Sequence, residues 1–154
     1  MTYWIVVGAP ENFQIAVDRG FDLFGFKSTR RREASTMQPG DKLIFYLTGV
    51  MRFGGIASVT SQTFEDHTPI FSSKKKPSED YPFRVHTKAE LILEEDDFLD
   101  VREWGPRMEY TKRWPEEHWR LAFQGNLHQI PASDYKMLEK EMRAAVKARA
   151  KANP

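Results

Sequence analysis

The stretch PGDKLIFYLTGVMRFGGIAS, residues 39–58, decides the fold. Its opening Pro-Gly-Asp is a turn signal, because proline presets φ and glycine accepts the positive φ that follows. Residues 42–48 are apolar on both faces, which predicts a central buried strand. A short connection then leads to another predicted strand, from residue 53 to about residue 64. The Gly54-Gly55 pair inside it indicates a β-bulge or the close approach of another backbone or of a ligand.

Further elements are predicted on either side of this stretch. Residues 3–7 form a short aromatic and β-branched run that is typical of a buried strand, and residues 10–19 predict a short helix. Residues 66–82 are rich in Pro, Ser and Lys, which predicts a mobile loop. Apolar and polar residues alternate over 83–93, as in a half-buried strand, and an apolar stripe over 132–149 predicts a closing amphipathic helix.

These elements predict an α+β fold in which a strongly curved antiparallel or mixed sheet, able to close as a barrel, carries flanking helices. The length of 154 residues fits a single domain, 1–154, with one core. No apolar run approaches the roughly 20 residues of a membrane span. The N-terminus lacks the basic region and cleavage site of a signal peptide, so we expect a soluble, cytoplasmic protein without a membrane partner.

Composition and motifs argue against an enzyme. The chain has no Cys, which excludes disulfides, thiolate zinc sites and a cysteine nucleophile. It contains no nucleophile elbow, no phosphate-binding loop and no dinucleotide-binding glycine motif. Its four His residues lack the paired spacing of a zinc site, so we expect no metal, no cofactor and no catalytic residue. The acidic run 94–97 is a candidate general acid or base, but such a run is usually a solvated surface.

Aromatic residues next to basic ones are the more suggestive pattern. The chain holds 11 Phe, 5 Tyr and 4 Trp, and its net charge of +1 hides an uneven layout. Phe24 and Phe26 directly precede a basic cluster at residues 27–32. Phe71 precedes a run of three lysines, and Trp114 follows two cations. Aromatic faces beside cations suit nucleic acid, since every base offers a π face and every nucleotide a phosphate. The alternative is that these rings fill the core and the cations flank strand ends.

Several motifs occur in a fixed order along the chain. They are Tyr3-Trp4-Ile5-Val6-Val7, Glu11-Asn12-Phe13, Pro39-Gly40-Asp41-Lys42-Leu43-Ile44-Phe45-Tyr46, Phe53-Gly54-Gly55-Ile56-Ala57, Asp66-x-Thr68-Pro69-Ile70, Tyr81-Pro82-Phe83-Arg84-Val85 and Gln124-Gly125-Asn126-x-x-x-Ile130-Pro131. By this ordered set, which spans about residues 3–140, the chain resembles the EVE domain family. The resemblance implies a PUA-like fold, which is a small curved mixed β-barrel with helices packed around it.

The resemblance also implies a function. EVE domains are similar to YTH domains, which bind RNA carrying N-methylated adenine, and are themselves thought to read modified bases, notably modified cytosines in DNA. Neither family is catalytic on its own. EVE domains often accompany restriction-type defence systems, and some PUA-like domains are accessory to RNA modification. The implied partners are therefore DNA or RNA with a modified base, together with defence or RNA-modification proteins.

The resemblance assigns roles to individual residues. In the YTH pattern an Asn after the first strand contacts the edge of the base, and Asn12 lies at that point here. Phe24 and Phe71 match the two aromatic walls of the pocket, where relatives often have Trp. Phe26 and Trp114 are further aromatic candidates for the pocket. A Phe has a smaller π surface than a Trp, so the identity of the base stays open.

We therefore expect a non-catalytic reader of a flipped-out, modified base, in which Lys27, Arg30 and Arg31 hold phosphates. A second hypothesis is a protein that binds a small molecule or a free nucleotide in the same pocket. At the level of residues, Asn12 could instead cap the first helix, and Phe24 could instead be a core residue.

Overall fold

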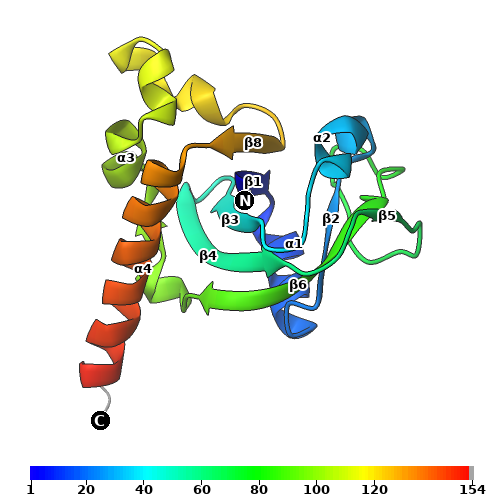
Figure 1. Ribbon diagram of the computed structural model, residues 1–154, viewed down its shortest axis with the longest axis horizontal. Helices are drawn as coiled ribbons and strands as arrows, with labels where there is room; N and C mark the ends of the chain where they lie inside the picture. Colours follow the sequence, from blue (N-terminus) through cyan, green and yellow to red (C-terminus); the bar gives the residue numbers. More distant parts are fainter. Residues whose placement is uncertain (153–154) are drawn as a thin grey trace.

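A curled, mixed β-sheet runs through the chain and carries helices on both of its faces (Figure 1). The computed structural model describes residues 1–152. The strands are β1 (Tyr3–Gly8), β2 (Leu23–Phe26), β3 (Lys42–Leu47), β4 (Arg52–Val59), β5 (Phe64–Glu65), β6 (Phe83–Ile92), β7 (Leu99–Asp100) and β8 (Leu127–Ile130). The α-helices are α1 (Pro10–Asp18), α2 (Arg31–Ser35), α3 (Val101–Trp104) and α4 (Ala132–Ala152). The 3₁₀ helices are η1 (Ser28–Arg30), η2 (Glu95–Asp97), η3 (Gly105–Arg107), η4 (Tyr110–Arg113) and η5 (Glu116–Phe123).

The strand order is β2-β6-β4-β3-β1-β8, with β5 paired to β6 and β7 paired to β4. Strands β1 and β3 are parallel, whereas the other pairs are antiparallel, so the sheet is mixed. Among the described residues no ladder joins the two end strands, β2 and β8, so the sheet is a curled half-barrel. The guanidinium group of Arg30, in the segment after β2, lies against Gly125 in the turn before β8. This contact brings the two edges of the half-barrel together.

The central hairpin confirms both interpretations of the glycine pair. Between β3 and β4, Phe45 pairs with Gly55 and Tyr46 pairs with Phe53, so Gly54 is the extra residue of a β-bulge. A Cβ on Gly55 would lie 2.6 Å from the carbonyl oxygen of Leu91, which is too close for any side chain. The bulge and the close packing of β6 therefore both require glycine here. Strand β4 ends at Val59, so the prediction that it continues to about residue 64 is wrong.

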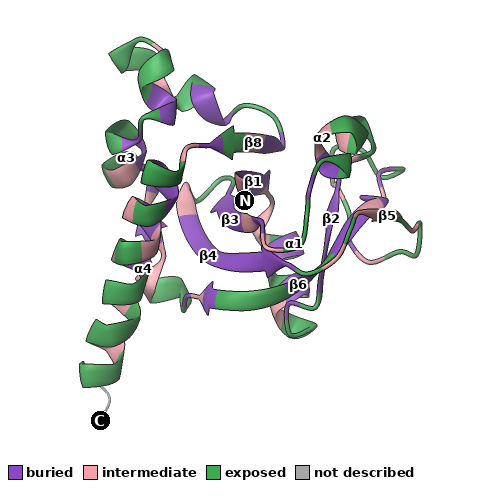
Figure 2. Cartoon of the chain, viewed as in Figure 1, coloured by how far each residue is buried: buried purple, intermediate pink, exposed green. Residues whose placement is uncertain are grey.

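Side chains of the sheet alternate between two cores. Trp4 and Val6 lie in the first core, with residues of α1 and α2, whereas Ile5 and Val7 lie in the second core, with residues of α4. In Figure 2 buried residues follow the central strands, and the outer sides of α2 and α4 are exposed. The first part of the amphipathic stripe of α4 packs on the second core, as predicted, through Tyr135, Leu138 and Met142. Val146, the last position of the predicted stripe, is 42% exposed. No helix within residues 1–152 is both long enough and apolar enough to cross a bilayer.

Two predictions about the region around β6 need correction. The alternating pattern predicts Arg84 on the polar face of this strand, yet its side chain is fully buried. The composition of residues 66–82 predicts a mobile loop, yet several buried side chains fasten this segment, hereafter the 66–82 loop, to the rest of the fold. The two findings are linked, because the guanidinium group of Arg84 donates to the carbonyl oxygens of Thr68, Asp80 and Tyr81 in that loop.

Candidate functional site

Three of the predicted aromatic residues lie together where the 66–82 loop covers β2. Phe24 and Phe26 belong to β2, Phe71 belongs to the loop, and all three are buried in the first core. The ring centroids of Phe24 and Phe71 are 5.1 Å apart, with the planes tilted by 47°. A base held between two rings needs about 7 Å, or two layers of about 3.5 Å. The two rings are thus in contact, and no base fits between them in this arrangement.

Asn12 lies beside this cluster and does not cap the first helix. The N-cap of α1 is Ala9, and Asn12 occupies the first turn with its side chain buried. Its amide nitrogen donates to the carbonyl oxygen of Ser72 at 2.9 Å, and its amide oxygen accepts from the Ser72 N–H at 3.1 Å. Burial raises the pKa of the nearby Tyr81 hydroxyl, and Ser73 and Asn12 oppose that shift. One amide group thus joins α1 to the tip of the loop.

Two further contacts hold the 66–82 loop on β2. The buried carboxylate of Glu79 accepts from the backbone N–H and the hydroxyl of Ser28. A Cβ on Gly25 would lie 2.6 Å from the carbonyl oxygen of Tyr81 and 3.1 Å from the Phe71 ring, so β2 needs glycine at this position. Tyr81 itself has a φ of +50°, a strained value for an aromatic residue. Such strain is typical of a segment whose conformation is fixed by its surroundings.

The predicted phosphate-binding residues follow the aromatic cluster in space as well as in sequence. Lys27 is half-buried before η1, and Arg31 is exposed on α2. Arg31 lines a shallow hollow of about 610 Å³ together with Thr29, Arg32, Glu33 and Ser35. Arg30 differs, because it lies against Gly125 and is 3.8 Å from the Glu33 carboxylate. Arg31 is thus well placed for a phosphate, whereas Arg30 is already partly engaged within the protein.

Trp114 is not brought together with the other aromatic candidates. It packs against Tyr110, with 5.5 Å between the ring centroids, next to the second core on the other face of the sheet. There it lines a separate hollow of about 580 Å³ that also includes Lys112 and Trp119. A role for Trp114 in binding stays a prediction, and it would concern a different surface.

Sequence reasoning missed the residues that hold the site together, namely Ser72, Glu79 and Arg84. Arg84 lies at a polar position of an alternating strand, and nothing in that pattern distinguishes a buried cation from an exposed one. Burial lowers the pKa of its guanidinium group, and the nearby carboxylates of Asp66 and Asp80 oppose that shift. Tyr81 does carry a signal in the sequence, because it opens one of the ordered motifs of the chain.

Known proteins resemble this chain both in sequence and in fold. The sequence model of the EVE domain matches residues 2–141. A UPF0310 protein of Pyrococcus horikoshii is 27% identical over 150 residues, which cover 91% of this chain and 98% of that protein. The YTH domain of Zygosaccharomyces rouxii MRB1, solved with N6-methyladenosine RNA, has a TM-score of 0.62 at 15% identity and covers 92% of this chain and 86% of its own. Human THYN1, solved with DNA containing 5-methylcytosine, has a TM-score of 0.61 at 12% identity, covering 92% and 98%.

Proposed function

The chain belongs to the EVE domain family, and on that premise we propose that it is a non-catalytic nucleic-acid-binding domain that reads a modified, flipped-out base. The base would enter at the contact between Phe24 and Phe71, next to Asn12. The nucleic acids in the structures of the YTH domain and of THYN1, which share this fold, support the proposal.

The observation that carries the proposal is the double hydrogen bond between Asn12 and Ser72. The Asn12 amide uses one donor and one acceptor on the neighbouring N–H and C=O of a single residue. An Asn amide offers the same donor and acceptor pair to the edge of an adenine. The backbone of Ser72 thus occupies the place in which a base edge would meet Asn12.

Binding then requires the tip of the 66–82 loop to move. Withdrawal of Ser72 frees the Asn12 amide, and withdrawal of Phe71 opens the face of Phe24. Ser72 is exposed, so water can satisfy its backbone groups after the loop moves. Flipping a base costs a few kcal/mol, and each stacked base contributes about 1–3 kcal/mol, so stacking on the aromatic faces and the Asn12 hydrogen bonds both contribute to offsetting that cost.

Positive charge next to the pocket supplies the contacts to the backbone of the nucleic acid. Lys27 and Arg31 follow β2 in the chain, and the exposed lysines 74–76 lie in the loop itself. Contacts to phosphates position a nucleic acid without reading its sequence. In this proposal Asn12 and the aromatic rings recognise the base, and the cations attract the phosphates.

The test is a binding array of DNA and RNA oligonucleotides, single- and double-stranded, with and without one modified base, measured by fluorescence anisotropy at two salt concentrations. We expect tighter binding to one modified form, and a log–log salt slope near −0.9 for each phosphate neutralised on duplex DNA. Binding of free nucleosides with no salt dependence would instead favour the small-molecule hypothesis. Equal affinity for every modified and unmodified oligonucleotide would overturn the reading role.

A further inference from the structure

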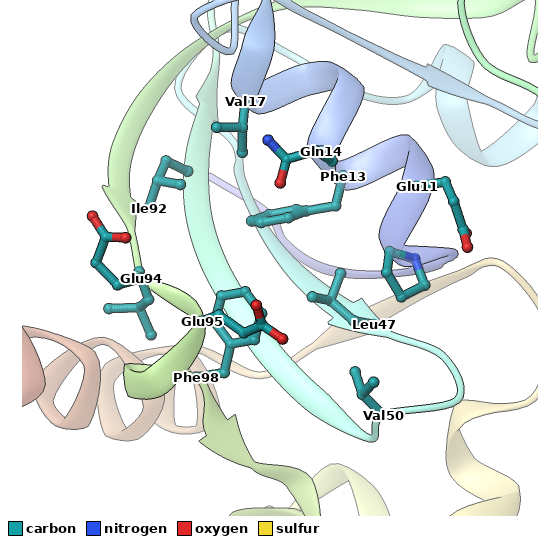
Figure 3. A pocket seen from close by; sticks show the side chains of 12 residues that line it. Glu11, Phe13, Gln14, Val17, Leu47, Val50, Ile92, Glu94, Glu95 and Phe98 are labelled. Atoms are coloured by element: carbon teal, nitrogen blue, oxygen red, sulfur yellow. The ribbon is translucent and has the colours of Figure 1, made fainter.

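A third hollow lies along α1 and differs in chemistry from the candidate base site. It has a volume of about 580 Å³ and is lined by α1, the end of β3, the turn before β4 and the segment from the end of β6 to residue 98. Figure 3 shows apolar side chains, among them Leu47, Val50 and Phe98, with Glu11, Glu94 and Glu95 around them. We call this hollow the acidic groove.

Charge sets the kind of ligand that the acidic groove can take. Within residues 1–152 its lining includes three glutamates and neither lysine nor arginine, and one of the three, Glu11, pairs with Lys74 of the 66–82 loop at 3.7 Å. Phosphates are repelled by such a surface, so nucleic acid does not suit it. The neighbouring acidic turn already attracts a cation of the chain itself, because Arg149 at the end of α4 donates to the carboxylate of Asp97. This acidic turn thus already holds one guanidinium group of the chain itself.

The apolar part of the groove adds a second requirement. Val50 is 49% exposed at its rim, and Phe98 is partly buried where it meets Phe13, with 6.1 Å between their ring centroids. An apolar side chain inserted among Leu47, Val50 and Phe98 would remove further apolar surface from water. An occupant should therefore carry an apolar anchor with cations on both sides of it.

We propose that the acidic groove docks a basic segment of a partner protein, in which one or two apolar residues enter between Leu47, Val50 and Phe98 while flanking Lys or Arg residues pair with Glu94 and Glu95. Asn12 points to the 66–82 loop, whereas Glu11 lines the groove and also pairs with Lys74 of that loop. Helix α1 thus carries residues of both surfaces, and Glu94 and Glu95 of the groove lie outside the candidate base site.

The test uses three fluorescein-labelled peptides: GKRSLFSRKG, the same peptide with Ser in place of Leu and Phe, and GESSLFSSEG. The first should bind at least ten-fold more tightly than the other two, and in NMR spectra the methyl groups of Leu47 and Val50 should shift on binding. Glu94→Gln with Glu95→Gln should weaken binding about five-fold, as expected for the loss of two partly exposed ion pairs. Val50→Ser should weaken binding of the first peptide and leave the second unchanged.

The matched control is Glu116→Gln with Glu117→Gln, which removes the same charge from another exposed acidic pair. The proposal is overturned if this control weakens binding as much as the groove variant, or if the peptide without anchors binds equally well. It is also overturned if ultracentrifugation shows a dimer that the groove variant dissociates, since the occupant would then be a second copy. Oligonucleotide binding should be the same in both variants, so the outcome is independent of the proposed reading function.

Discussion

At Asn12 a single amide group holds the 66–82 loop on α1 through two hydrogen bonds to Ser72. Replacing Asn12 with Ala removes both hydrogen bonds to Ser72, and the free energy of unfolding should fall by about 1–2 kcal/mol. Affinity for modified and unmodified oligonucleotides should become nearly equal, while the salt slope stays unchanged, because the variant removes a hydrogen bond to the base and no charge. Anisotropy titrations at two salt concentrations measure both quantities. Gln14→Ala, an exposed change on the same helix, should alter neither of them.

Two roles of Phe24 can be tested separately, namely packing in the core and stacking on a base. Phe24 is 5% exposed and packs on Phe45 with 4.9 Å between the centroids, so Phe24→Ala should cost about 3–5 kcal/mol of stability, as for any core Phe. Phe24→Leu is the sharper test, because it keeps most of the volume and should cost less than about 1.5 kcal/mol. Loss of the π face should still weaken oligonucleotide binding by about 1–3 kcal/mol. Unchanged affinity, as we expect for Phe45→Leu, would show that Phe24 belongs to the core alone.

The 66–82 loop is the element whose stability should depend on pH. His67 lies 2.8 Å from the Glu65 carboxylate and 2.7 Å from that of Asp80, and these hydrogen bonds raise its pKa. A raised pKa in the folded protein means that the stabilisation is complete below the ordinary value of about 6.5 and is lost as the pH rises through the higher folded value. Amide hydrogen exchange in the loop, corrected for intrinsic rates, should therefore show less protection at pH 8 than at pH 5.5.

Two variants check the assignment of this effect to His67. His67→Gln should make the protection of the loop nearly the same at both pH values, because the titrating group is gone. His86→Gln changes another exposed histidine, on β6, and should leave the pH dependence intact. If His86→Gln abolished the difference in protection between the two pH values, the group responsible for it would be His86 on β6 and not His67.

Elements with a strong internal pattern could be predicted, and elements fixed by distant contacts could not. The stripe of α4 and the proline start of α1 act within a few residues, so the sequence indicates them directly. The end of β4 instead depends on how the strands pair. Residues 60–63 are no less suited to a strand by local pattern, but the chain leaves the sheet there, and β5 pairs separately with β6. The attachment of the 66–82 loop likewise depends on two residues outside it. Asn12 is far from the loop in sequence, and the alternating pattern of β6 does not indicate that Arg84 is buried.

At the scale of the whole molecule, strand pairing decides which residues meet. The first strand lies inside the sheet, parallel to β3 and antiparallel to the end strand β8, and no local pattern gives those partners. The same topology separates Trp114 from Phe24 by placing them beside different cores. Aromatic and basic residues that are adjacent in sequence thus indicate a type of chemistry, but not which face of the sheet each ring occupies.

The positions of the basic residues allow the attraction of phosphates to be tested separately from the recognition of a base. Replacing Arg30 and Arg31 with Ala should weaken modified and unmodified oligonucleotides by similar factors and reduce the salt slope by about one for each phosphate that is no longer neutralised. The single variants should differ, because Arg31 is exposed, whereas Arg30 joins the two edges of the half-barrel at Gly125. We expect Arg31→Ala to lower mainly the slope and Arg30→Ala to lower the melting temperature as well.

Lys136→Ala with Lys140→Ala supplies the control for that experiment, since it removes two exposed charges from α4, on the second core. If binding follows net charge alone, the two double variants should reduce the salt slope equally, because a uniform field does not depend on where the charges lie. If the phosphates run past α2, as the exposed position of Arg31 on that helix allows, the Arg variant should reduce the slope and the Lys variant should not. A double Arg variant that kept its slope but lost the preference for a modified base would reverse the roles assigned to Arg31 and Asn12.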